Sequence, residues 1–571
     1  MSDENDLEFE QSQAGDLAAN PPSATDRALV KSSSVMAAGT VFSRITGIGR
    51  DIAMTAALGF FLVSDAYSLG NSLPNIVYIL VVGGALNAVF IPQLVRHMKD
   101  DADGGHGYAN RLLTITSTAL FVLAVLAIIF APQIVDLYTP NDYPQSQLEL
   151  ATAFARLCLP QIFFYGIYAM LSQVLNARGK FGAPMFAPIA NNIIAIATFG
   201  LFLIIAGTSA AADGALTTDQ ILLLGIGTTL GVAAQAIILI PVLIRTGFRF
   251  RPMFDWKGAG LGKSGSLAMW TIGLVLVNQL AYIVITRLAT QANVDAALSG
   301  TVAAGLTTYQ KAHLVFVLPH SVITVSIVTA LLPALSRVAH SGNLRQVGFD
   351  IGKTMRMVAV LIIPVSAVLI LLGPQIAALL FGYGAATAAQ AGLMGTIVSI
   401  FVLGLLPFTL FYVLLRGFYS LEDTKTPFWV TVVFNVVYLA LAIPLFELFL
   451  TGGQQVAMLA LGYSVAYWFV FLLTWYLLHR RLGTVDSKST SVTLLKLVIA
   501  AVLAFAVMLG VQAIMTTYVT GGGLENKFGV LVNVIVVAAV GLLIYLVLAR
   551  FLKVGELTQV TGMIRNRLVR R

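Results

Sequence analysis

Residues 35–58 have the sequence VMAAGTVFSRITGIGRDIAMTAAL, in which three charged residues interrupt an otherwise apolar stretch. A helical membrane crossing needs about 20 largely apolar residues, and this segment is long enough to be one. Placing one Arg or Asp near the centre of a bilayer costs about 2.5–3.5 kcal/mol on the gentler insertion scales. The stretch therefore predicts a transmembrane helix in which Arg44, Arg50 and Asp51 have a reason to be kept.

The whole chain has the composition of a membrane protein. Of its 571 residues, 58% are hydrophobic and 11% are charged, whereas a typical soluble domain has about 25% charged residues. The one cysteine, Cys158, excludes an internal disulfide and a cysteine-rich metal site. We therefore expect an all-α integral membrane protein.

Apolar segments between polar breaks predict fourteen transmembrane helices, with boundaries uncertain by several residues. The second and eighth segments are longer than a plain crossing requires. The approximate ranges are 33–59, 64–98, 108–136, 147–177, 183–207, 219–246, 267–293, 299–337, 350–373, 388–421, 427–450, 455–480, 491–517 and 527–551.

Charged loops and tails predict the orientation of these helices. Lys and Arg gather in every second loop, including the basic linker at 247–266, and in the tail at 552–571; Lys527, in an outer loop, is the exception. Cytoplasmic loops carry the excess of Lys and Arg, so both termini are expected in the cytoplasm. Residues 1–32 are acidic and lack an apolar core, so we expect a disordered cytoplasmic tail rather than a signal peptide.

An internal repeat divides the chain. Matches recur in the same order at an offset near 243 residues; for example, PQLVR at 92–96 matches PALSR at 333–337. The repeat predicts two six-helix lobes at 33–246 and 267–482, followed by two extra helices at 491–551. A site at the interface of two such repeats, near the membrane midplane, is typical of transporters.

The geometry of a regular helix limits how the charges in the first segment pair with one another. Arg44 and Asp51 share a helix face, but seven residues rise about 10 Å, which is too far for comfortable direct pairing. Arg50 lies about 120° away from Arg44 around the axis. Gly47 and Gly49 could bend the helix and change both relations.

Two explanations therefore stay open for these charges. In the first, the arginines line a wet cavity and bind an anion, because the planar guanidinium matches phosphate oxygens bidentately. In the second, buried ion pairs only hold helices together, and Asp65 is a further candidate partner.

Other motifs do not indicate chemistry of their own. Asp100, Asp101 and Asp103 lie in a glycine-rich loop and are interpreted as a solvated turn. His313 and His320 share a helix face, where packing or pore lining explains them better than a metal does. No nucleophile–base pair and no soluble basic module can be identified. We expect no enzyme activity, no cofactor, no metal site and no nucleic-acid partner.

Several motifs together resemble one known family. They are FSRITGIGRD at 42–51, SDAY at 64–67, LPNI at 73–76, FIPQLVR at 90–96, LNARGKFGAPMFAPIANN at 175–192, LLPALSR at 331–337 and GFYSLEDTKTP at 417–427. The chain is similar over about 33–550 to the MurJ/MviN lipid II flippases, as a member of the actinobacterial type. The resemblance implies fourteen helices in two lobes around a central cavity, within the superfamily that also holds the drug-extruding MATE exporters.

The resemblance implies that Ser43, Arg44, Arg50, Asp65 and Asn75 lie in or beside this cavity. Arg44 and Arg50 are expected to clamp a diphosphate.

Asp51 and Asp65 are expected to hold the arginines in place or to break a gate, with Gly47 and Gly49 as the flexible points. Lys311 is expected to assist the clamp.

The chain departs from the family pattern at three places. Many relatives have an arginine just after LPN, where this chain has Tyr78, and an Asp-Arg pair where this chain has His313 and Leu314. Lys311, close by, is a candidate replacement for that cation. Some relatives bind sodium through carboxylates in the second lobe. The corresponding spans here offer no carboxylate, and the candidates for a coupling-ion site are Asn278, Thr431 and Asn435.

The function that the resemblance implies is transport of lipid II, an undecaprenyl-diphosphate carrying a disaccharide-peptide, from the inner to the outer leaflet by alternating access. The expected location is the bacterial plasma membrane, and the expected partners are lipid II, membrane lipids and proteins of cell-wall synthesis and division. The alternatives are a flippase for another polyprenyl-linked oligosaccharide or a MATE-like exporter. A membrane scaffold or a polyprenyl-phosphate enzyme is a weaker alternative.

Overall fold

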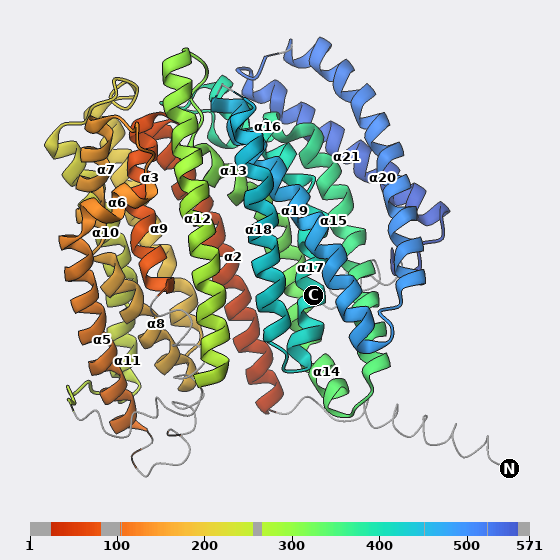
Figure 1. The fold of residues 1–571 in the computed structure, drawn as a ribbon, viewed down its shortest axis with the longest axis horizontal. Coiled ribbons are helices and arrows are strands. Elements are labelled where there is room, and N and C mark those ends of the chain that lie inside the picture. Colours follow the sequence, from red (N-terminus) through yellow and green to blue (C-terminus); the bar gives the residue numbers. More distant parts are fainter. Residues whose placement is uncertain are drawn as a thin grey trace.

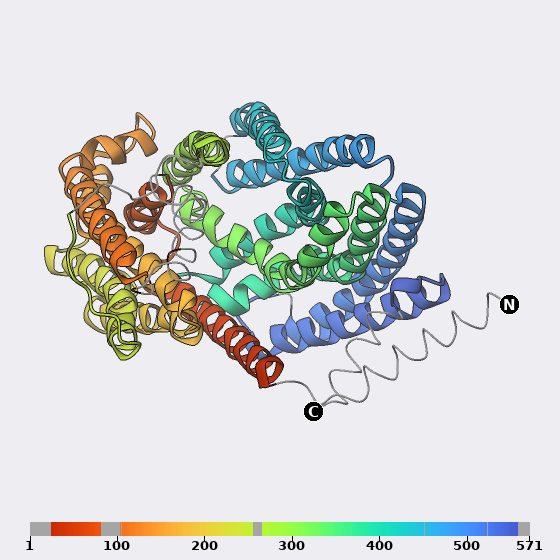
Figure 2. The same ribbon diagram turned by 90° about the horizontal axis from the view of Figure 1, so that it is seen from below.

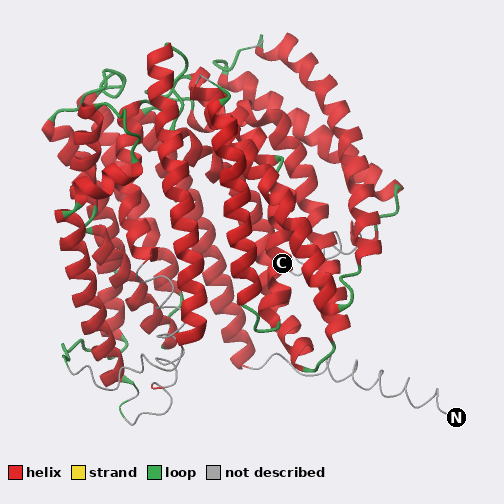
Figure 3. Ribbon diagram, in the orientation of Figure 1, coloured by secondary structure: helices red, strands yellow, loops and turns green. Residues whose placement is uncertain are grey.

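The computed structural model describes residues 24–80, 97, 103, 105–254, 265–449, 452–521 and 523–557. These residues form helices that run roughly side by side and short connecting loops, with no strand in the described ranges (Figure 1 and Figure 3). The α-helices are α2 (Ala24–Leu58), α3 (Leu62–Tyr78), α5 (His106–Ile129), α6 (Ala131–Tyr138), α7 (Gln145–Cys158), α8 (Gln161–Ala177), α9 (Gly182–Ala206), α10 (Thr218–Ile237), α11 (Leu239–Arg245), α12 (Gly265–Ser299), α13 (Leu306–Pro319), α14 (Val325–His340), α15 (Leu344–Phe381), α16 (Ala388–Val402), α17 (Leu405–Ser420), α18 (Lys425–Glu447), α19 (Gly452–Leu482), α20 (Ser487–Met515) and α21 (Lys527–Phe551).

Within the described ranges, eleven helical segments are long and apolar enough to cross a membrane, or twelve if α16 and α17, bent by 47°, form one span. The prediction of an all-α membrane protein is therefore confirmed. Helices α2 and α3 are not among these segments; α3 has 17 residues, and the rest of the second predicted span lies largely outside the described residues. The count of fourteen stays a prediction.

The helix pairs of the N-terminal half (α2–α11) recur in the C-terminal half (α12–α19). Helix α2 packs on α9, α3 on α7, and α9 on α10. In the C-terminal half, α12 packs on α18, α13 on α16, and α18 on α19. The two halves form opposite sides of the molecule, coloured red to yellow and green to blue (Figure 1 and Figure 2).

Two predicted boundaries differ from the structure. Helix α2 begins at Ala24, so residues 24–32, expected in the disordered tail, are helical because good helix formers follow the last proline of that tail. The eighth segment begins at Leu306 rather than 299, because a loop with Gly300 in the left-handed region precedes it.

Proline also shapes that eighth segment. Pro319 ends α13, and a π-helical turn, His320–Thr324, joins it to α14. Proline lacks the N–H that an α-helical hydrogen bond needs, so the regular ladder is interrupted here.

The last two helices, α20 and α21, pack against α15 through a core of their own. Small residues let these helices approach closely, and the Tyr545 hydroxyl donates a hydrogen bond of 3.0 Å to the carbonyl oxygen of Val360. Arg356 of α15 is buried and pairs with Asp486 and Glu556, each at 2.5 Å. Since Asp486 precedes α20 and Glu556 follows α21, one guanidinium holds both helices to α15.

Replacing Arg356 with methionine is expected to lower the free energy of unfolding by about 3–5 kcal/mol, because two carboxylates then lose their buried partner. Lys353→Met, an exposed position on the same helix, is the matched control and should change stability by less than about 0.5 kcal/mol. Thermal unfolding in detergent measures both. Equal midpoints for Arg356→Met and the control would contradict the role given to Arg356.

Candidate functional site

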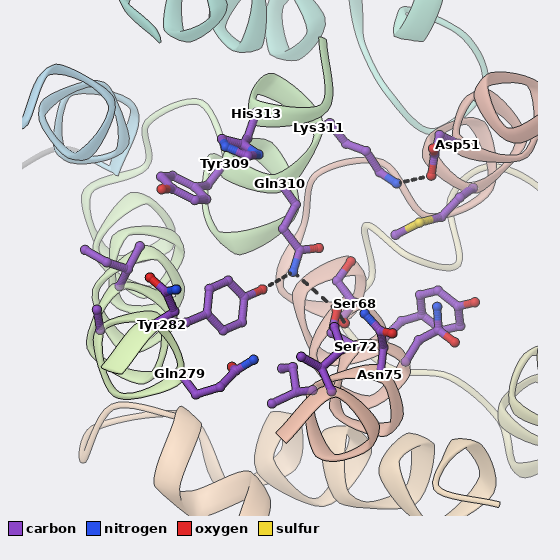
Figure 4. A pocket seen from close by; sticks show the side chains of 18 of the residues that line it. Asp51, Ser68, Ser72, Asn75, Gln279, Tyr282, Tyr309, Gln310, Lys311 and His313 are labelled. Atoms are coloured by element: carbon purple, nitrogen blue, oxygen red, sulfur yellow. Dashed lines mark hydrogen bonds and ion pairs between the residues drawn. The ribbon is translucent and has the colours of Figure 1, made fainter. Parts of the chain in front are cut away.

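A cavity of about 660 Å³ lies between the two halves of the molecule. Its lining residues come from α2, α3, α8, α9 and α10 of the N-terminal half and from α12, α13, α18 and α19 of the C-terminal half. The volume falls within the range of about 300–1,000 Å³ that small-molecule sites usually have. The cavity has one charged side and one neutral polar side (Figure 4).

The charged side is formed by Arg50, Asp51 and Lys311, which we call the ionic cluster. The Lys311 ammonium lies 2.5 Å from the Asp51 carboxylate, and the Arg50 guanidinium lies 3.5 Å from the same oxygen. The side chains of Lys311 and Asp51 are each 9% exposed, whereas that of Arg50 is 38% exposed. Two cations share one carboxylate, so the cluster keeps a net positive charge that faces the cavity.

Arg44 and Ser43 lie outside this cavity. Arg44 is exposed and donates a hydrogen bond of 2.8 Å to the Ser321 hydroxyl, which lies in the π-helical turn after α13. The carbonyl oxygen of Ser43 accepts a hydrogen bond from the Asn192 amide of α9. The residue that pairs with Asp51 is therefore Lys311 of the other half rather than Arg44 of its own helix.

Gly47 and Gly49 do not interrupt α2, which is continuous from Ala24 to Leu58. A Cβ atom at either position would meet side chains of α9 at 3.6 and 3.5 Å, which are ordinary van der Waals distances. Packing in this conformation therefore does not require glycine at these positions.

Asp65 is buried in the first turn of α3 and contacts the start of α13. Its carboxylate accepts hydrogen bonds from the backbone N–H groups of Leu306 (3.0 Å) and Thr307 (2.7 Å) and from the Asn293 amide (2.8 Å). The first N–H groups of a helix have no partner within it, and a carboxylate there is also favoured by the helix dipole. A Cβ atom on Gly305 would lie 2.1 Å from this carboxylate, so only glycine allows the approach.

Arg287 makes the opposite contact. Its guanidinium, on α12, donates to the backbone carbonyl oxygens of Asp136 (3.2 Å) and Leu137 (3.3 Å) in the last turn of α6, and to Asn141 (2.8 Å). A cation at a helix C-terminus is favoured by the dipole as an anion is at the N-terminus. Each half thus places one charge on a helix end of the other, and we call the Asp65 and Arg287 contacts the helix-end latch.

The residues suggested for a coupling ion lie partly in the cavity. Asn278 and Asn435 line it, and the Asn435 amide donates to the Asn278 oxygen at 2.9 Å. Thr431 lies outside the lining, and its hydroxyl donates to the Pro427 carbonyl oxygen. The described residues contain no group of three or more His, Cys, Asp or Glu side chains that could hold a metal ion.

The two histidines have separate aromatic surroundings. His313 lines the cavity and lies 3.1 Å from the Tyr463 hydroxyl, whereas His320 lies 3.3 Å from the Thr409 hydroxyl.

Asp103 accepts hydrogen bonds from the backbone N–H groups of Gly105 and Gly107, and these bonds lower the pKa of its carboxyl group. Asp103 therefore belongs to a loop turn; Asp100 and Asp101 lie outside the described residues.

Comparison with known proteins agrees with this arrangement. The family model described as "Lipid II flippase MurJ" matches residues 54–529. A probable lipid II flippase MurJ of Rhizobium meliloti is 28% identical over 454 residues, which cover 78% of this chain and 81% of that protein. The corresponding protein of Buchnera aphidicola subsp. Baizongia pistaciae is 26% identical over 449 residues, covering 78% and 81%.

Solved structures share the fold. The lipid II flippase MurJ in an inward closed conformation superposes with a TM-score of 0.69 at 20% identity and covers 90% of this chain and 98% of that one. An inward-facing multidrug MATE transporter gives a TM-score of 0.60 at 14% identity, covering 78% and 96%.

Proposed function

This chain belongs to the MurJ family of lipid II flippases, and from that premise we propose that it moves lipid II across the membrane by alternating access, with the headgroup held in the cavity between its two halves. Such a protein is a multi-pass membrane transporter. Lipid II cannot cross hydrocarbon unaided, because its charged and polar headgroup would lose its hydration. The ionic cluster is the observation that carries this proposal.

In our proposal the diphosphate binds to Lys311 and Arg50. Two cations that share a single carboxylate leave one positive charge unbalanced, and a diphosphate can balance it. The Arg50 fork can hold two phosphate oxygens at once, whereas Lys311 acts as a point charge. We assign to Asp51 the role of a resident counter-ion that the diphosphate displaces.

Arg44 and Ser43 are not placed in the diphosphate site. Both precede the ionic cluster on α2, and we propose that Arg44 contacts the headgroup on its way to the cavity. Asn75 lines the cavity and contacts the headgroup there. Asn278 and Asn435, with Thr431 behind them, stay our candidates for a coupling-ion site.

We further propose fourteen crossings in two lobes at 33–246 and 267–482, with both termini in the cytoplasm. Helices α2 and α3 add two crossings to the twelve segments found by length and composition. The recurrence of the same helix pairs in both halves supports the lobes. Under this topology the helix-end latch lies on the outer side and closes the cavity there, so that the headgroup enters from the cytoplasmic side.

The topology predicts where reporter fusions face. A reporter placed after Val485, or at the C-terminus, is expected to report cytoplasm, while one inserted within 208–218 is expected to report the outside. Paired phosphatase and fluorescent-protein fusions measure this directly. A cytoplasmic signal from 208–218 would contradict the count of fourteen.

The function itself is tested by depleting the protein in its host and measuring lipid II in each leaflet. We expect lipid II to accumulate in the inner leaflet, out of reach of a reagent added outside the cell, and expression of the wild-type chain to restore its exposure. Unchanged exposure of lipid II after depletion would contradict the proposed function. Contacts with proteins of cell-wall synthesis stay a prediction.

A further inference from the structure

The side of the cavity away from the ionic cluster holds neutral polar side chains. Ser72 and Asn75 come from α3, Gln279 and Tyr282 from α12, and Gln310 from α13, and their side chains point into the same space (Figure 4). We call these five residues the neutral cluster. They are amides and hydroxyls, which supply both hydrogen-bond donors and acceptors without charge.

The hydrogen bonds of two glutamines in the neutral cluster indicate which groups could bind a ligand. The Gln310 amide nitrogen donates to the Tyr282 hydroxyl at 3.0 Å and to the Ser72 hydroxyl at 3.3 Å. The side-chain oxygen of Gln279 is buried and has no hydrogen-bond partner among the described residues. A buried polar atom without a partner is costly, so a donor on a ligand that reached this oxygen would relieve that cost.

A phosphate cannot supply that donor, because an ionised phosphate only accepts hydrogen bonds. Hydroxyl and acetamido groups can both donate and accept, and they are the polar groups of an N-acetylated sugar. Amide side chains and a tyrosine hydroxyl are therefore complementary to the sugar rather than to the diphosphate.

The positions of the two clusters fit the covalent structure of such a headgroup. Gln310 and Lys311 are consecutive residues of α13, and successive side chains on a helix diverge by about 100°. Lys311 points toward Asp51 of the ionic cluster, whereas Gln310 points toward Tyr282 and Ser72 of the neutral cluster (Figure 4). The first sugar is bonded directly to the diphosphate, so two adjoining subsites on one helix turn can hold both units at once.

We propose that the neutral cluster is a sugar subsite, specific for an acetamido sugar unit next to the diphosphate, with Gln310 and Gln279 as its specificity-determining residues. This inference rests on the proposed function, because the ionic cluster must hold the diphosphate. Gln310 also links the halves through Ser72. A sugar hydroxyl that accepts from the Gln310 amide competes with that link, so occupancy of the subsite weakens a contact between the halves.

The test compares two ligands on the full-length chain in lipid nanodiscs. The probes are lipid II, which carries the sugars, and undecaprenyl diphosphate, which carries none. Wild-type protein is expected to bind lipid II more tightly. Gln310→Leu and Gln279→Leu, which each remove hydrogen bonds to the sugar, are expected to weaken lipid II binding by about tenfold. Both should leave binding of undecaprenyl diphosphate within about twofold.

Two further variants separate the possible failures. Lys311→Met is expected to weaken binding of both probes, whereas Gln346→Leu, an exposed glutamine on α15, should change neither. The Gln279 oxygen has no hydrogen-bond partner in the part of the chain that the structure describes, so Gln279→Leu can still be measured if Gln310→Leu does not fold. Equal losses for both probes in the glutamine variants, or no loss for lipid II, would overturn the sugar subsite. A wild-type protein that binds neither probe would instead overturn the proposed function.

Discussion

Replacing Lys311 with methionine is expected to abolish lipid II transport and to lower the free energy of unfolding by about 3 kcal/mol. The loss of stability follows because Asp51, 9% exposed, would keep only the 3.5 Å contact with Arg50, and a buried charge that loses its partner is strongly destabilising. The loss of transport follows because the cavity would lose one of the two cations proposed to hold the diphosphate. Growth of a depleted strain and thermal unfolding of the purified variant measure the two effects.

A second substitution separates these effects. The double variant Lys311→Met with Asp51→Leu removes the stranded carboxylate, so its stability is expected to return close to that of the wild type while transport stays absent. Lys180→Met, an exposed lysine in the loop after α8, is the matched control and should change neither. If the double variant supported growth, the pair would serve only to hold helices together and the diphosphate site would be wrong.

Replacing Asp65 with alanine is expected to open the outer side of the cavity. Leu306, Thr307 and Asn293 would each lose a hydrogen-bond acceptor in a buried setting, at a combined cost of about 3 kcal/mol to the closed state. That cost shifts the balance between closed and open forms by about a hundredfold. We expect transport to fail because the cavity can no longer close to the outside.

A cysteine placed in the cavity measures this opening. The only native cysteine, Cys158, is buried, so Asn75→Cys, in the cavity lining, can be labelled selectively by a membrane-impermeant maleimide added outside. Labelling should be slow in the otherwise wild-type chain and at least about tenfold faster with Asp65→Ala. Asp142→Asn is the control, since the hydrogen bond that its carboxylate accepts among the described residues, from Gln291, is exposed. Unchanged labelling with Asp65→Ala would remove Asp65 from the latch.

The sequence predicted the helical membrane fold and the presence of charged residues within a helical span, because both follow from local composition. Hydropathy marks the spans, and Arg50 and Asp51 are conspicuous within one of them. Helix geometry also correctly argued against direct pairing of Arg44 with Asp51. Helix geometry could not identify Lys311 as the partner of Asp51, because Lys311 lies 260 residues away and contacts Asp51 only through the packing of the two halves.

The contacts of the latch could not be predicted from the sequence for a different reason. Asp65 was expected to contact an arginine, since charges suggest charged partners, but its partners are mainly backbone N–H groups of α13. Backbone groups are the same in every residue and leave no signature in the sequence. Gly305 was the one available signal, and its meaning depends on knowing that Asp65 approaches it.

The use of backbone groups in the latch restricts how variation can alter it. Leu306 and Thr307 donate through main-chain N–H groups, which every residue except proline possesses, so side-chain changes there leave the donors in place. Proline is well accepted at the first position of a helix, so Leu306→Pro could delete one donor without breaking α13. Substitutions at Leu306 and Thr307 that fit the same buried space can therefore keep the contact with Asp65, whereas substitutions at Asp65, Arg287 or Gly305 change the latch directly.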